Sequence, residues 1–247
     1  MKAYITQNNK IQIVSICFIL LVWQVLAVLA SNEIKLPTPI STISSLFEIV
    51  TSNNFFINIA GTLKRVLISF IISFILGTSL GILAGFYERF FYFLKPIVII
   101  LKSTPTIAVI LLSLIWLGRE ISPILVGFLI VFPLIYSTVV TSISNIDKTL
   151  IEMVTVYNFS TIKRFKHLYL PSIWSNLSSI AVSTVGLSIK VCIAAEVLSQ
   201  PKYGIGSGFQ LEKVALNTGG LIAWSIIAVL LAELFEHILS YFFKKIT

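Results

Sequence analysis

Three ionisable residues interrupt long apolar runs of the sequence, and chemistry is expected first at these positions. Lys102 precedes a Ser-Thr-Pro-Thr stretch, Lys190 follows a run rich in small residues, and Glu196 lies six residues further on. A charged side chain inside a membrane costs at least about 2.5–3.5 kcal/mol, so it should face a partner or a water-filled cavity. The expected chemistry is the passage or gating of a polar solute.

Lys102, Thr104 and Pro105 form the first candidate site on such a route. Proline lacks a backbone N–H, so it breaks or kinks a helix and frees carbonyl groups beside the lysine. Freed carbonyls next to a cation suit a polar route through a membrane. The alternative is a lysine near the cytoplasmic end of a kinked helix, with its ammonium reaching the membrane surface.

Lys190 shares a small, polar helix face with Ser183 and Gly186, because these residues are spaced by three or four. It either lines the route or belongs to a structural ion pair. Glu196 is about 120° away around the same helix. It therefore points elsewhere, and a structural or gating role is expected in preference to solute contact.

Motifs for catalysis are absent from the sequence. It contains no GxxxxGK[ST] phosphate loop, no HExxH and no GxSxG. His167 and His237 are isolated, and Cys17 and Cys192 lie in apolar runs without a CxxC partner. We expect no catalytic site, metal site, disulfide or bound cofactor in this chain.

The composition is that of an integral membrane protein. The 247 residues are 57% hydrophobic and 11% charged, with a mean hydropathy of +0.98. A soluble domain carries roughly 25% charged residues, so soluble enzymes, disordered chains and disulfide scaffolds are excluded. The net charge of +8 indicates lysines and arginines beside membrane segments, and no nucleic-acid partner is expected.

Runs of about 20 apolar residues are long enough to cross a bilayer as helices. We predict one all-α membrane domain over residues 1–247, with six transmembrane helices at about 11–30, 62–87, 96–118, 121–146, 172–198 and 216–243. Val28-Leu29-Ala30 is similar to a signal-peptide cleavage site. The apolar core before it exceeds the usual length of about 7–15 residues, which favours a retained helix.

The distribution of lysine and arginine predicts the orientation. These residues concentrate in the segments 1–10, 88–95, 147–167 and 244–247, which places both termini of a multi-pass cell-membrane protein in the cytoplasm. After the Leu36–Pro39 segment, apolar residues recur at helical spacing. This pattern predicts an amphipathic helix on the outer membrane surface.

Small residues in the second predicted span indicate close helix packing. Gly77, Gly81 and Gly85 recur every four residues. Such a row forms one flat stripe along a helix and lets another backbone approach closely.

The cytoplasmic segment 147–171 holds the densest charge cluster and carries a recognisable pattern. Glu152-Met153-Val154 is followed six residues after the glutamate by Asn158, and thirteen residues later by Pro171 at the end of Leu168-Tyr169-Leu170-Pro171. This spacing resembles the EAA loop of permeases in binding-protein-dependent ABC importers, which has the form EAA, three residues, Gly, about nine residues and I-x-L-P. Two alanines and the glycine are replaced here, but asparagine tolerates the left-handed backbone that glycine adopts.

The resemblance covers nearly the whole chain and is specific to the nitrate/sulfonate/taurine branch of MetI-like permeases. Its motifs match, in order, an L-P-x-P segment, T-L-x-R-V, a G-x-x-x-G stretch, a Pro-containing span ending in W-x-G, and A-E followed by G-x-G. The matching residues are Leu36–Pro39, Thr62–Val66, Gly77–Gly85, Pro105 to Gly118, Ala195-Glu196 and Gly204–Gly206.

The resemblance implies an assembly. Two permease copies form the pathway, two cytoplasmic ATPase subunits carry the ATP and Mg²⁺, and an extracytoplasmic binding protein delivers the solute. A short coupling helix in segment 147–171 would dock on each ATPase through Glu152, Met153, Val154, Asn158, Lys163, Arg164, Leu170 and Pro171. Lys163 and Arg164 would either orient this loop on an acidic ATPase rim or bind anionic membrane lipid.

The solute implied by this branch is small and polar, and expected to be an anion such as nitrate, a sulfonate or taurine, or else a vitamin precursor. Two other classes of protein remain as alternatives. A secondary transporter driven by an ion gradient would show internal repeats with paired broken helices. A membrane scaffold or channel subunit would need no coupling loop.

Overall fold

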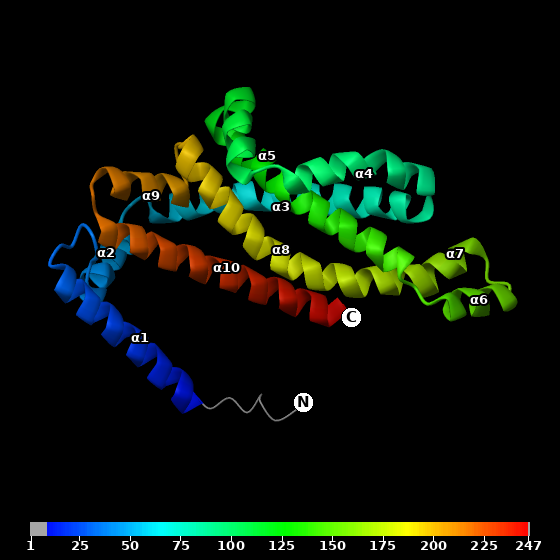
Figure 1. The fold of residues 1–247 in the computed structure, drawn as a ribbon, viewed down its shortest axis with the longest axis horizontal. Helices are drawn as coiled ribbons and strands as arrows, with labels where there is room; N and C mark the ends of the chain where they lie inside the picture. The colour runs from blue at the N-terminus through cyan, green and yellow to red at the C-terminus, as the bar shows by residue number, and fades with distance from the viewer. Residues whose placement is uncertain (1–8, 247) are drawn as a thin grey trace. The chain divides into compact units, whose positions relative to one another are not determined.

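The computed structural model describes residues 9–246 (Figure 1), so Lys2, counted above among the cytoplasmic lysines, lies outside it. All regular structure in this part of the chain is helical. The elements are α1 (Asn9–Ala30), α2 (Pro39–Thr51), α3 (Phe55–Phe86), α4 (Glu88–Ser103), α5 (Thr106–Ser144), α6 (Lys148–Val156), α7 (Thr161–Arg164), the π-helical turn η1 (Phe165–Tyr169), α8 (Leu170–Ser199), α9 (Ile205–Val214) and α10 (Thr218–Ile246).

Five of the described helices are long and apolar enough to cross a membrane, where the sequence predicts six. They cover the segments Ile13–Ala30, Phe55–Phe86, Thr106–Ser144, Thr161–Ser199 and Thr218–Phe243. The difference lies in the predicted span 96–118. In the structure this segment is divided, because α4 ends at Ser103 and Pro105, which has no N–H to continue the helix, begins α5. The number of crossings stays a prediction.

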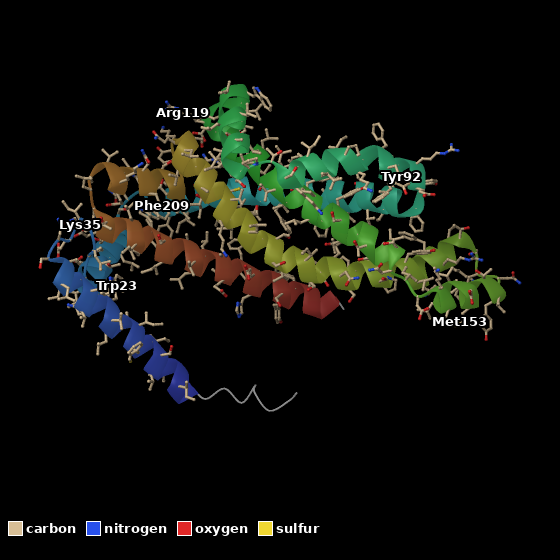
Figure 2. All side chains as sticks on the ribbon, viewed as in Figure 1. Trp23, Lys35, Tyr92, Arg119, Met153 and Phe209 are labelled. Atoms are coloured by element: carbon tan, nitrogen blue, oxygen red, sulfur yellow. The ribbon has the colours of Figure 1, made fainter. Side chains whose placement is uncertain are left out.

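Helix α5 folds back on itself at Gly118. A straight helix of its 39 residues would be about 58 Å long, nearly twice the hydrocarbon thickness of a membrane. Gly118 has φ 74° and ψ −175°, which only glycine adopts readily. The hydroxyls of Ser113 and Ser122 are 2.6 Å apart, whereas residues nine apart in a straight helix are separated by about 13.5 Å. The chain reverses where the sequence analysis ends its third span; Figure 2 labels Arg119 at this bend.

The chain divides into two compact units. The first contains the residues through Phe56 together with Gly208–Ile227. In it, Trp23 Nε1 donates to the Pro37 carbonyl at 3.0 Å, which fixes α1 to the turn before α2. Thr38 caps α2, since its hydroxyl accepts from the Ser41 N–H at 3.1 Å. The amphipathic helix expected after Leu36–Pro39 is therefore α2, and its location on the outer surface stays a prediction.

The second unit contains Ile57–Ser207 and Ala228–Thr247. Its core lies along the second half of α5, which runs beside α8 (Figure 1). Four α5 side chains spaced by four residues pack with two from α8: Val131, Ile135, Val139, Ile143, Ile173 and Leu177. On its other side α5 contacts α3 and α4 through Phe132 and Tyr136. Because α5 is covered on both sides, it is the central helix of this unit.

The glycine stripe of α3 packs directly on α5. Gly77, Gly81 and Gly85 lie against Ile135, Val139 and Ile143, respectively. A Cβ atom on Gly81 would lie only 2.8 Å from Val139 Cβ and 3.1 Å from the Tyr136 carbonyl oxygen. The absence of side chains on this stripe is what permits the close approach of the two helices.

Candidate functional site

The predicted coupling segment 147–171 begins with a capped short helix. Asp147 is the N-cap of α6, and its carboxylate accepts from the Thr149 N–H at 2.9 Å. This hydrogen bond holds the pKa of Asp147 below its usual value. After α6 the chain turns at Asn158, whose φ of 52° is the left-handed conformation that the family pattern requires of its glycine. Ser160 then caps α7.

Apolar side chains are exposed along α6 and α7. Glu152 and Met153 are exposed, and Figure 2 labels Met153 on α6, whereas Val154 is buried and anchors the helix. Val156 is 79% exposed and Ile162 is 80% exposed. Two helices shorter than any membrane span thus present apolar side chains that no residue within 9–246 covers.

The basic end of the segment is tied back to the turn before it. The Arg164 guanidinium donates through Nε to the Phe159 carbonyl at 3.0 Å, and Lys163 is exposed. Aromatic contacts attach the next turn to α3, because the Phe86 ring lies 4.7 Å from the ring of Tyr169. The segment is therefore fixed at both ends and exposed between them.

Leu170 and Pro171 lie in a continuous helix, although the sequence analysis placed them in a loop. The Leu170 N–H donates to the Phe165 carbonyl five residues earlier, which makes η1 a π-helical turn. This wider turn accommodates Pro171, which has no N–H to donate. As a result α7, η1 and α8 form one helical run from Thr161 to Ser199.

The first candidate pathway site lies where α4 ends. Lys102 Nζ donates to Ser137 Oγ of α5 at 2.6 Å. Thr104 Oγ1 donates to the Ile100 carbonyl at 2.7 Å, which caps the end of α4, and Pro105 is the exposed N-cap residue of α5. The lysine is therefore held against the second half of α5.

Lys190 is exposed on α8 and makes no ion pair with any described residue. One turn before it, the carboxylate of Glu236 on α10 lies against Gly186, so closely that a Cβ there would overlap with it. Sequence reasoning did not single out Glu236.

Glu196 is fully buried at the centre of a polar cluster. One carboxylate oxygen accepts from Arg65 Nη1 at 2.9 Å. The other accepts from Thr62 Oγ1 at 2.8 Å and from the Gly206 N–H at 3.0 Å. Two of these donors come from α3 and the third from the start of α9, so the carboxylate joins α3, α8 and the start of α9.

Arg65 extends the cluster to the bend of α5. Its guanidinium forms an ion pair with Glu120 and also donates to the Tyr203 carbonyl at 2.8 Å. Glu120 in turn accepts from the Lys202 N–H at 2.8 Å. The sequence analysis assigned no role to Arg65 or Glu120, although the T-L-x-R-V and A-E motifs contain three of the residues that meet here, Thr62, Arg65 and Glu196. We call Thr62, Arg65, Glu120 and Glu196 the Arg65 cluster.

Neither unit offers an evident metal site: no group of three or more His, Cys, Asp or Glu residues within 9–246 could hold an ion. The geometry consists of an exposed segment, one long helix leading from it, and a buried charge cluster at the other end of that helix.

Comparison with known proteins identifies the family. The model of the binding-protein-dependent transport system inner membrane component family matches residues 77–247. Over 230 residues the chain is 26% identical to a Bacillus subtilis permease named for aliphatic sulfonates transport, covering 92% of this chain and 83% of that protein. The Escherichia coli protein of the same name is 30% identical over 222 residues, covering 87% and 82%.

A nitrate import permease of Leptolyngbya laminosa is 29% identical over 214 residues, covering 82% of this chain and 74% of that protein. Among solved structures, a chain of the inward-facing MetNI methionine ABC transporter matches the fold with a TM-score of 0.65. That match has 18% sequence identity and covers 78% of this chain and 96% of the other. The chain therefore belongs to the binding-protein-dependent transport system inner membrane components, as a multi-pass MetI-like permease of the nitrate and sulfonate branch of ABC importers.

Proposed function

We propose that two copies of this permease form the pathway by which an ATP-driven importer takes up a small anion. The names of the relatives, which transport aliphatic sulfonates or import nitrate, support this class of solute. A binding protein on the outer side delivers the anion, and an ATPase subunit carrying ATP and Mg²⁺ binds each permease in the cytoplasm. Both termini then lie in the cytoplasm, with six crossings of the membrane.

The observation that carries the proposal is the exposed apolar surface of α6 and α7. Val156 and Ile162 are 79% and 80% exposed. Their segment connects two spanning helices, α5 and α8, and would therefore lie outside the membrane. Burial of a side chain of this size against a partner contributes about 1.5–3 kcal/mol. A cleft on the ATPase would supply that burial.

The helical run from Thr161 to Ser199 provides the mechanical connection. Its α8 part alone, with 30 residues, is about 45 Å long. A shift of α7 on ATPase closure passes into α8 and reaches Glu196 near its far end. ATP binding then favours one of two arrangements of the bundle, as expected of a rigid-body switch.

The test is purification of the tagged chain from its native membrane in mild detergent, with mass spectrometry of the proteins that come with it. We expect one nucleotide-binding ATPase per permease. Ile162→Glu should remove the ATPase and leave the chain inserted, since a charge now occupies the docking surface. Glu152→Lys should have the same effect.

Val214→Glu is the matched control, because Val214 is an apolar residue of α9 that is 75% exposed. Equal recovery of the ATPase with Ile162→Glu and Val214→Glu would contradict the docking assignment. Purification of the chain alone, together with solute flux that follows an ion gradient and ignores ATP, would favour the secondary transporter.

A further inference from the structure

A polar cavity lies between the second half of α5 and the first half of α8. Its volume is 490 Å³, and nine of its ten lining residues are serine, threonine or asparagine, with Ile180 as the exception. Facing helices in a membrane usually close such surfaces by direct packing of small side chains. Here Ser172 Oγ joins the two polar faces by donating to the Ser142 carbonyl at 3.2 Å. Beside this contact the faces leave a space within the usual size range of small-ligand sites, about 300–1,000 Å³.

Hydrogen bonds divide the lining into two kinds of group. The hydroxyls of Ser137, Thr138 and Ser142 donate to carbonyls one turn earlier, at 2.7, 3.0 and 2.7 Å, so their oxygens remain free to accept. Three other lining side chains, those of Thr141, Asn145 and Ser179, form no hydrogen bond with a described residue. Their donors are available to a molecule in the cavity.

Lys102 brings a positive charge to this lining. Its ammonium is 2.6 Å from Ser137 Oγ, and an ammonium has three donors, so two remain free. No carboxylate lines the cavity, and Lys102 forms no ion pair with any residue of the described chain. The charge is therefore uncompensated, which favours a ligand with one negative charge.

We propose that the α5–α8 cavity is a binding site of the permease itself for a small oxoanion with one negative charge. This inference rests on the proposed function and deepens it by locating the anion. The oxygens of the anion accept from Lys102 and from Thr141, which is one turn along α5 from Ser137, while the hydroxyl oxygens of Ser137 and Ser142 hold its remaining water molecules.

A single cation among uncharged groups also suits transport. Conduction needs binding that is favourable enough for the solute to enter and weak enough for it to leave. Lys190 lies seven residues after Ser183, which lines the cavity. Seven residues correspond to about 10.5 Å along α8 on nearly the same face, so a second cation follows the site along the helix.

The experiment uses the purified full-length permease in phosphatidylcholine nanodiscs with trifluoromethanesulfonate as the probe. Broadening of the ¹⁹F resonance reports weak binding of this sulfonate. We expect broadening with the wild-type chain and its reversal by excess nitrate. Lys102→Gln should weaken binding about tenfold, since a charge-assisted hydrogen bond is lost, whereas Lys102→Arg should retain most of it.

Lys95→Gln is the matched control, because it removes one exposed positive charge from the same helix, α4. The absence of broadening with the wild-type chain, or equal broadening with Lys102→Gln and Lys95→Gln, would overturn the site. So would loss of broadening in phosphatidylglycerol nanodiscs, since the same chemistry would then belong to a lipid phosphate. Recruitment of the ATPase is measured separately and does not involve Lys102, so a permease that binds its ATPase and ignores the probe would refute this site alone.

Discussion

Replacing Arg65 with methionine leaves the buried carboxylate of Glu196 without the guanidinium that faces it. The side chains of Arg65 and Glu196 are 8% and 0% exposed, and the two atoms that join them are 2.9 Å apart. Removal of one partner from a buried ion pair costs about 3–5 kcal/mol, because the other charge stays in a medium of low polarity. The second ion pair of Arg65 adds little to this loss, since Glu120 is 58% exposed.

For a chain of this size, 1 kcal/mol corresponds to about 2–4 °C in melting temperature. The expected loss for Arg65→Met is therefore roughly 6–20 °C. The assay is thermal unfolding of the purified permease in detergent, followed by tryptophan fluorescence. Lys64→Met is the control, because it removes the same charge from an exposed neighbouring residue, and its melting temperature should stay close to that of the wild type.

The double variant Arg65→Met with Glu196→Met makes the test sharper. When both partners of a buried pair are replaced by apolar residues of similar volume, much of the loss is recovered. We therefore expect the double variant to melt above Arg65→Met alone. A loss with Arg65→Met no larger than that with Lys64→Met, or a double variant that melts lower than either single one, would refute the reasoning.

Two other predictions concern the α3–α5 contact and the cap of α6. Gly81→Ala places a methyl group 2.8 Å from Val139 Cβ and should destabilise the protein by about 1–3 kcal/mol. Adding Val139→Ala should restore part of the lost melting temperature. A double variant that melts no higher than Gly81→Ala would argue against the contact. The Thr149 N–H lowers the pKa of Asp147 in the folded protein. The ionised carboxylate therefore stabilises α6 fully above the unfolded pKa of about 3.9. This stabilisation is lost as the pH falls through the folded pKa. The protection of the α6 amides, measured relative to their intrinsic exchange rate at each pH, should fall below about pH 4 in the wild type. Asp147→Asn, which keeps a capping oxygen at all pH values, should show no such onset.

Much of the fold could be predicted from local sequence patterns. The lengths of the apolar runs predicted the positions of α1, α3, α8 and α10, because a membrane requires about 20 apolar residues in a helix. Asn158 was expected to adopt a left-handed backbone from its place in the family pattern, and it does. These features depend on neighbouring residues alone.

Contacts between distant segments could not be predicted in this way. Arg65 and Glu196 are 131 residues apart in the sequence. Helical periodicity predicts the helix face on which a residue lies, but it does not predict which other helix packs against that face. The sharpness of the reversal at Gly118 depends on a φ angle that the composition of the W-x-G stretch does not reveal. The π-helical turn before Pro171 also went unpredicted, because its hydrogen bonds shift by only one residue from those of an α-helix.

The order in which the chain is synthesised determines when the Arg65 cluster can form. A ribosome adds about 5–20 residues per second, so the 131 residues from Arg65 to Glu196 take about 7–26 seconds. Glu120 follows Arg65 by 55 residues and emerges after about 3–11 seconds. Tyr203 and Gly206, which also contact Arg65 and Glu196, emerge later still, so the hydrogen bonds of the buried cluster cannot be complete until α8 and the start of α9 have been made.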